Sequence, residues 1–127
     1  MNQKNKKNFK LTNKQEISNV YQHGKTFRNF PFRLSWTKRK EEDDFKVLIS
    51  VPKKKFKKAV DRNLIKRQVR EVLYKKIIDP YLQYKHINLV ITYIGDQKID
   101  FKELESKMII TFRKFISKHY SDEKKTN

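Results

Sequence analysis

The chain has 127 residues and a formal net charge of +18, with 32 Lys or Arg against 14 Asp or Glu and no cysteine. This length suits one domain around one core, and the lack of cysteine excludes thiolate nucleophiles, Cys-ligated zinc and iron–sulfur clusters. No apolar run approaches the roughly 20 residues that span a bilayer, and the first residues lack a secretion signal, so we expect a soluble cytoplasmic protein without a membrane partner.

The first predicted element is a helix over about residues 13–23. Thr12 followed by Gln15 fits a capping box at its start, and Gly24 suits a left-handed cap at its end. Between them an apolar stripe recurs at helical spacing, formed by Ile17, Val20 and Tyr21. Tyr21 lies at the edge of this stripe, so a core position and a ligand contact both stay open for it.

Two strands are predicted next. The first alternates Phe32, Leu34 and Trp36 with Arg33, Ser35 and Thr37, and the second places Phe45, Val47, Ile49 and Val51 on one face. We expect the two strands to pair as a hairpin, with the polar residues 38–44 as its turn. The alternation assigns Phe32 and Trp36 to the core rather than to base stacking. The acidic residues 41–44 fit a solvated turn better than a divalent cation site.

The most informative segment follows Pro52, which ends the second strand. Residues 53–76 hold 11 Lys or Arg against Asp61 and Glu71, a net charge of 11 − 2 = +9. They predict a helix whose apolar side carries Ile65, Val69, Val72 and Leu73 and whose other side carries Arg62, Asn63, Lys66, Arg67 and Arg70. Exposed helices usually intersperse Glu with Lys, so a merely solvated face is the weaker interpretation. Guanidinium and amide groups favour contact with nucleic acid.

The last part of the chain predicts one strand and one helix. Asp79 and Pro80 are expected to stop the central helix, and residues 87–94 are apolar on both faces, as in an interior strand. Asp100 with Glu103 predicts the cap of a closing helix with an apolar stripe. The fold class is therefore α+β, a small mixed sheet with helices in the order α-β-β-α-β-α. We expect one RNA-binding domain over residues 9–120, with disordered tails at residues 1–8 and 121–127.

No active site carried by the protein itself is visible in the sequence. The two glycines, Gly24 and Gly95, are too far apart for a glycine-rich phosphate loop. The three histidines, His23, His86 and His119, have no carboxylate or hydroxyl partner at a recognisable spacing and are expected in surface or capping roles.

Residues 50–71, SVPKKKFKKAVDRNLIKRQVRE, resemble the signature of the bacterial ribonuclease P protein subunit. The matching positions are Ser50, Val51, Lys53, Lys54, Lys58, Ala59, Val60, Arg62, Asn63, Ile65, Lys66, Arg67, Arg70 and Glu71. The resemblance extends over roughly residues 9–118. Two departures leave their effects open: Leu64 stands where the family has Arg, and the connector around Phe56 is one residue longer than the common form.

The resemblance implies an αβββαβα fold with a left-handed βαβ crossover, and a function in tRNA 5′ maturation. The protein would join a catalytic RNA, one to one, in an endoribonuclease that removes the 5′ leader of precursor tRNA, with Mg²⁺ held mainly by the RNA and no DNA partner. The implied contacts to the catalytic RNA are Lys53, Lys54, Lys58, Arg62, Asn63, Lys66, Arg67 and Arg70. Those to the leader are Ile17, Tyr21, Arg33, Ser35 and Ser50, with Ile17 at a position where the family has an aromatic residue.

Three other functions compete with this interpretation. A structural ribosomal-type RNA-binding protein would be equally small and basic, and it is the main alternative. A helix-turn-helix DNA regulator would need a short helix where the strand and Pro52 stand. A protein-only nuclease would cleave RNA without an RNA partner.

Overall fold

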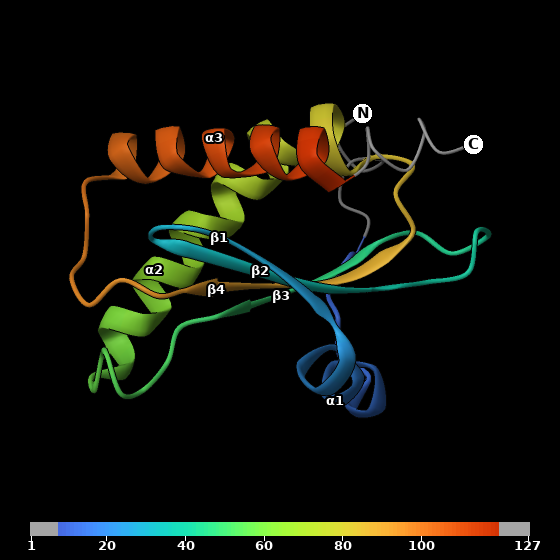
Figure 1. Cartoon of the computed structure of the whole chain (residues 1–127). Helices are drawn as coiled ribbons and strands as arrows, with labels where there is room; N and C mark the ends of the chain where they lie inside the picture. Colours follow the sequence, from blue (N-terminus) through green and yellow to red (C-terminus); the bar gives the residue numbers. More distant parts are fainter. Residues whose placement is uncertain (1–7, 120–127) are drawn as a thin grey trace.

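The computed structural model describes residues 8–119, which form a four-stranded sheet between helices (Figure 1). The elements in chain order are α1 Lys14–His23, β1 Lys25–Asn29, β2 Phe32–Lys38, β3 Lys46–Ser50, α2 Ala59–Val72 continued by a π-helix Leu73–Leu82, β4 Ile87–Tyr93 and α3 Phe101–His119. The α+β class is confirmed, and so is the αβββαβα order that the resemblance implies. The predicted disordered tails lie outside the described residues, except for Asn8.

The strand order in the sheet is β1-β2-β4-β3, so the predicted hairpin between β2 and β3 is wrong. β4 lies between them, antiparallel to β2 and parallel to β3. The physical reason is that all seven residues of β4 are buried, and a strand that is apolar on both faces belongs in the interior of a sheet. Residues 38–44 therefore form a connection across the start of β4 rather than a hairpin turn, fixed by the Arg39 N–H donating to the His86 carbonyl at 2.7 Å.

β1 is the one strand in the described chain that the sequence pattern did not predict. Its five residues pair antiparallel with β2 as a hairpin. Phe27 is its single apolar side chain and is only half-buried, so no alternation marks the segment. Pairing with β2, rather than burial of its own side chains, makes this segment a strand.

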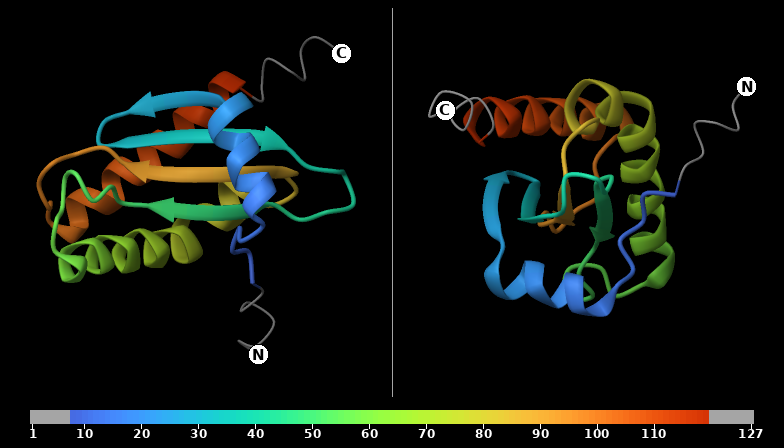
Figure 2. Two further views of the ribbon diagram at one scale, coloured as in Figure 1. Left: turned by 90° about the horizontal axis from the view of Figure 1, so that it is seen from below. Right: turned by 90° about the vertical axis from the view of Figure 1, so that its right-hand side faces the viewer.

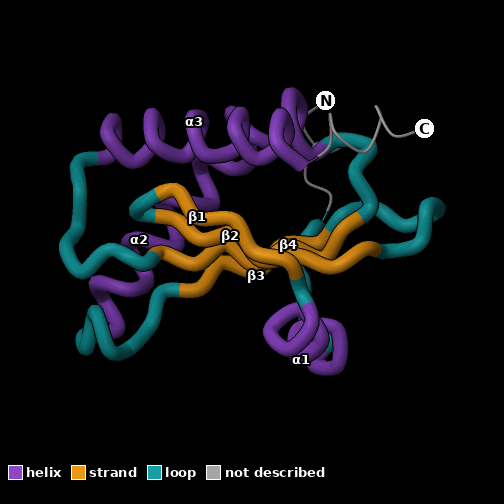
Figure 3. Tube along the Cα trace, viewed as in Figure 1, coloured by secondary structure: helices purple, strands orange, loops and turns teal. Residues whose placement is uncertain are grey.

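The sheet separates two layers of helices. α1 lies alone on one face, while α2 and α3 lie on the other (Figures 2 and 3). The main core forms on the α2 and α3 side, where the apolar stripe of α2 and the buried residues of α3 meet the sheet; it includes Leu34, Leu89, Ile91, Ile65, Val69, Met108 and Phe112. A smaller cluster of Leu11, Val20 and Val90 holds α1 to the opposite face. With α2 on that side of the sheet, the β3–α2–β4 crossover is left-handed, against the usual rule for such connections (Figure 2).

Both ends of α1 differ from the caps that the sequence predicts. The N-cap of α1 is Asn13 rather than Thr12, because the Asn13 Oδ1 accepts the Glu16 N–H at 2.9 Å. Gly24 has φ −70°, so it is not a left-handed cap. It must nevertheless be glycine, because a Cβ there would collide with the Val20 carbonyl oxygen.

Asp79 and Pro80 do not stop the central helix. The helical path continues to Leu82 with Pro80 inside the π-helix, and it ends where Gln83 becomes extended. Ile77, Ile78 and Leu82 are buried along this continuation, and this packing outweighs the local preference of proline to break a helix.

Tyr93 gives a prediction about alkaline stability. Its hydroxyl donates to the Gln97 carbonyl at 2.6 Å, and burial, followed by the charges of Glu103 and Asp96, raises the pKa of Tyr93 above its ordinary value of 10.0. The folded state holds the hydroxyl proton of Tyr93 more tightly than the unfolded chain does. The stability that Tyr93 contributes is therefore fully present below about pH 10 and is lost as the pH rises through the folded pKa. We expect Tyr93→Phe to lose about 0.5–1.5 kcal/mol at pH 7. In urea unfolding, the midpoint of Tyr93→Phe should fall less steeply with pH above pH 10 than the midpoint of the parent protein. Equal dependence on pH in the two proteins would contradict the raised pKa of Tyr93.

Candidate nucleic-acid interface

The connector into α2 gathers exposed lysines at the start of the helix. Lys53, Lys54, Lys55, Lys57 and Lys58 are all exposed, while Phe56 between them is buried in the core. Lys58 occupies the N-cap of α2 without any side-chain cap. The N-terminal end of a helix already carries a partial positive charge, so added cations there are unfavourable unless an anion binds. This concentration of positive charge favours the binding of phosphate groups.

Arg62 holds the connector in place. Its Nη1 donates to the Phe56 carbonyl at 2.8 Å and to the Lys57 carbonyl at 2.9 Å. Beside it, Asp61 forms an ion pair with Lys98 at 2.9 Å, which ties the loop after β4 to the first turn of α2. Arg62 is therefore partly a structural residue, a role that the sequence pattern did not predict.

The rest of the polar side of α2 is free of local acidic partners. Asn63, Arg67 and Arg70 are exposed and Lys66 is half-buried. Within residues 8–119, no carboxylate forms an ion pair with these cations; the Glu71–Lys75 pair at 3.0 Å lies further along the helix. A merely solvated charged face would carry such pairs between neighbouring turns. The arrangement instead suits an external polyanion.

The sheet brings two of the predicted leader residues into one row on the α1 face. Arg33 of β2 lies opposite Thr92 of β4, and Thr92 lies opposite Ser50 of β3. The row also contains Arg28, directly opposite Arg33. Two like charges at directly opposed positions repel each other, and a bound anion would relieve that repulsion. The Thr92 Oγ1 is buried and has no hydrogen-bond partner among the described residues.

One flank of α1 borders this row. Val20 faces the sheet, so Glu16 and Tyr21 lie on opposite flanks of the helix. Glu16 accepts from Arg39 Nη1 at 3.1 Å, at the end of the sheet where β4 begins. The Tyr21 flank therefore faces the other way, toward the row that contains Thr92. Tyr21 is 53% exposed, which excludes the core position left open for it by the sequence. Its neighbour on this flank, the predicted leader residue Ile17, is half-buried against the small cluster.

Ser35 does not belong to the accessible row. It lies one row further along the sheet, opposite Val90, and is only 5% exposed. Arg28 and Thr92 are the members that sequence reasoning missed. Arg28 belongs to the unrecognised strand β1, and Thr92 is a polar residue inside a strand that otherwise looks wholly apolar.

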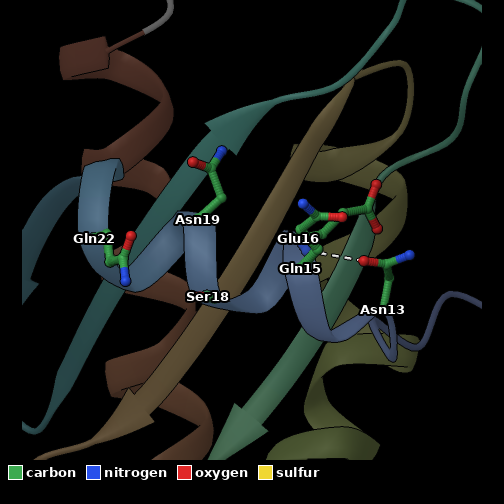
Figure 4. Close-up of a pocket in the computed structure, with 6 residues that line it drawn as sticks. All are labelled: Asn13, Gln15, Glu16, Ser18, Asn19 and Gln22. Carbon is green, nitrogen blue, oxygen red and sulfur yellow. Dashed lines mark hydrogen bonds between the residues drawn. The ribbon is translucent and has the colours of Figure 1, made fainter.

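A pocket on the outward side of α1 differs in charge from the basic surfaces described above. It is lined by Asn13, Gln15, Glu16, Ser18, Asn19 and Gln22 (Figure 4). Its lining has no basic residue and one carboxylate, so it does not attract phosphate. Among residues 8–119 there is no group of three or more potential metal ligands from His, Cys, Asp or Glu. No helix in this part of the chain is long and apolar enough to cross a membrane.

Comparisons with known proteins agree with this architecture. The solved structure of a Staphylococcus aureus RNase P protein superposes with a TM-score of 0.70 at 23% identity, covering 84% of this chain and 94% of that one. The RNase P protein from Thermotoga maritima gives a TM-score of 0.65 at 23% identity, covering 83% and 96%. At these identities the likeness establishes the fold.

The sequence comparisons establish the family. The ribonuclease P protein component of Porphyromonas gingivalis is 34% identical over 108 residues, which cover 80% of this chain and 79% of the relative. That of Listeria innocua is 29% identical over 106 residues, covering 82% and 85%. The family model described as Ribonuclease P matches residues 5–116. The chain therefore belongs to the ribonuclease P family and is a protein subunit of that tRNA-processing endoribonuclease.

Proposed function

We propose that this chain binds one catalytic RNA and the single-stranded 5′ leader of precursor tRNA in the cytoplasm, one protein to one RNA, while the RNA supplies the catalytic groups. The observation that carries the proposal is the basic side of α2 with its connector, where cations gather at a helix N-terminus and, within residues 8–119, form no ion pair with a carboxylate. Backbone phosphates are the polyanion that this surface fits, and contacts of this kind fix the register of a protein on RNA.

The surface for the catalytic RNA consists of the connector and the outward side of α2. Its residues are Lys53, Lys54, Lys58, Arg62, Asn63, Lys66, Arg67 and Arg70. Arg62 contributes mainly by holding the connector, since its Nη1 is already bonded to two carbonyls. Arg67 is exposed on the middle of the helix and is the clearest phosphate partner.

The surface for the leader is the open row of the sheet and the Tyr21 flank of α1. Tyr21 offers a plane on which any base can stack, and Ile17 beside it offers an apolar contact. Arg33 and Arg28 offer a pair of guanidinium groups to one phosphate, and Ser50 adds a hydroxyl at the end of the row. This combination binds single strands of many sequences, as an enzyme acting on many precursor tRNAs requires.

Hydrolysis is assigned to Mg²⁺ held by the RNA. Mg²⁺ takes oxygen ligands, and the phosphate oxygens of an RNA can supply them. The protein contributes by neutralising phosphates and orienting the leader. The test is reconstitution of precursor-tRNA cleavage with the cognate RNA, with and without the protein, at physiological Mg²⁺. Stimulation by the protein is expected. Cleavage by the protein alone would overturn the proposal, and binding to ribosomal RNA without any effect on cleavage would favour the ribosomal alternative.

Arg67→Ala is expected to weaken assembly with the catalytic RNA and leave the fold intact, because the side chain is exposed and forms no ion pair with any described residue. Each lost phosphate contact should reduce the slope of log affinity against log salt by about 0.7–0.9. Filter binding at several salt concentrations measures this slope. Lys114→Ala, which removes an exposed cation of α3 outside the polar side of α2, is the matched control and should leave the slope unchanged. Equal slopes for both variants would contradict the role of the α2 face.

A further inference from the structure

A groove lies along the outer edge of β3. One wall is the extended segment at residues 8–10, the floor is residues 47–49 of β3, and the other wall is the side of α2 and its continuation that carries Lys66, Arg70 and Tyr74. Its volume is about 350 Å³, at the small end of the range for ligand sites. A groove of this volume accommodates one small chemical group, of the size of a single nucleotide, rather than a double helix.

The floor of the groove offers an unpaired backbone donor and acceptor. The Val47 N–H donates to the Phe9 carbonyl at 2.7 Å, and the Val47 carbonyl accepts from the Leu11 N–H at 2.9 Å, so the backbone groups of Val47 point to the outer edge of the sheet. By the two-residue alternation of a strand, the N–H and C=O of Ile49 point to the same edge. The N-terminal segment turns away into α1 before it reaches Ile49, and no hydrogen bond joins these two groups to another described residue across that edge.

The walls combine positive charge with aromatic rings. Lys10, Lys66 and Arg70 line the groove, no carboxylate does, and within residues 8–119 none of the three forms an ion pair. Phe9 is fixed by stacking on Phe45 at 4.2 Å between ring centroids. Tyr74 lies 6.3 Å from Phe9 and is 40% exposed, so part of its ring is available to a ligand.

We infer that this groove binds one unpaired nucleotide of the catalytic RNA, an assignment that rests on the proposed function. The base contacts the ring of Tyr74, and a donor and acceptor on its edge pair with the backbone N–H and C=O of Ile49. The flanking phosphate lies against Lys66 and Arg70. Every base has such an adjacent donor and acceptor, so the groove selects an unstacked nucleotide rather than one base. An extended peptide would also pair with the strand edge, but it would leave three cations without an anion.

The first test compares two exposed tyrosines. Tyr74→Ala should weaken binding of the catalytic RNA by about 5- to 140-fold, which corresponds to 1–3 kcal/mol at 1.4 kcal/mol per tenfold change. Tyr74→Phe, which keeps the ring, should bind like the parent. Tyr84→Ala removes a tyrosine that is 83% exposed and lies outside the groove, and it should have no effect. Thermal unfolding of each variant shows whether the fold is retained.

The second test keeps an aromatic ring at this position, so its cross-linking step does not depend on the stability of Tyr74→Ala. Tyr74 is replaced by photoreactive benzoylphenylalanine, and the nucleotide that cross-links in the complex is mapped. We expect one nucleotide in an unpaired region, and removal of its base should weaken binding as much as Tyr74→Ala does, with no further loss when both changes are combined. A cross-link to a base-paired segment or to another protein would overturn the inference.

The outcomes separate this inference from the proposed function. If the parent protein binds the catalytic RNA and Tyr74→Ala binds it equally well, only the groove assignment fails. If the parent protein does not bind the catalytic RNA, the proposed function fails and the groove assignment fails with it.

Discussion

Tyr21→Ala is expected to lower the affinity of the reconstituted enzyme for precursor tRNA by about 1–3 kcal/mol, the contribution of one base–aromatic stack. Tyr21 is 53% exposed on the flank of α1 that borders the open row of the sheet, so truncation removes a ligand surface without opening the core. Assembly with the catalytic RNA should stay close to normal, because Tyr21 lies outside the basic side of α2. Equilibrium binding of both RNAs to parent and variant measures the two effects separately.

Mature tRNA is the control substrate for this prediction. It has no leader and offers no splayed base to stack on Tyr21, so both enzymes should bind it equally. Tyr84→Ala is the control variant, since Tyr84 is exposed on a loop before β4. A loss of affinity for mature tRNA, or a change in circular dichroism, would show that Tyr21 supports the fold and that the leader binds elsewhere.

Local patterns in the sequence predicted most of the elements. The central helix followed from one apolar stripe and one basic side, and its buried residues are those of the stripe. β4 followed from an unbroken apolar run, and α3 from a stripe whose Leu104, Met108, Phe112 and Phe115 are buried. In these segments local periodicity and tertiary burial agree, so the sequence alone was sufficient.

Strand neighbours were not predictable in the same way. A strand's alternation tells which residues share a face and says nothing about which strand lies beside it. The hairpin prediction for β2 and β3 assumed that consecutive strands pair, and β4 takes the place between them after a crossover of more than thirty residues. β1 has too few apolar residues to be recognised, and Arg28 on it was missed for that reason.

In the candidate site, too, some residues were predictable from local patterns and others were not. The basic residues of α2 were predictable because one helix carries them all. The leader surface depends on how four strands align, and the register joins Arg33 and Ser50 through Thr92 while Ser35 is buried one row away. The groove beside β3 depends on the contact between residues 8–11 and Val47, which no local pattern shows.

Arg39 joins α1, the connection after β2 and the start of β4. Its Nη1 donates to Glu16 Oε2 at 3.1 Å and to Asn88 Oδ1 at 2.7 Å, and its Nη2 lies 3.6 Å from Asp43 Oδ2. The side chain is only 13% exposed, and Asn88 is buried. Because hydrogen bonds to charged groups are each worth about 1.5–3 kcal/mol and Asn88 Oδ1 would lose its partner, these contacts fix the Glu16 flank of α1 on the sheet.

Arg39→Met is therefore expected to lower the free energy of unfolding by about 1.5–3 kcal/mol, measured as a fall in the urea midpoint with an unchanged m value. Lys38→Met, one residue earlier and exposed, is the matched control and should change it by less than about 0.5 kcal/mol. A double-mutant cycle with Glu16→Gln should show coupling between the two side chains. Since the contact orients α1, Arg39→Met should also weaken binding of precursor tRNA relative to mature tRNA. Equal midpoints for Arg39→Met and Lys38→Met would mean that the small cluster of Leu11, Val20 and Val90 alone positions the helix.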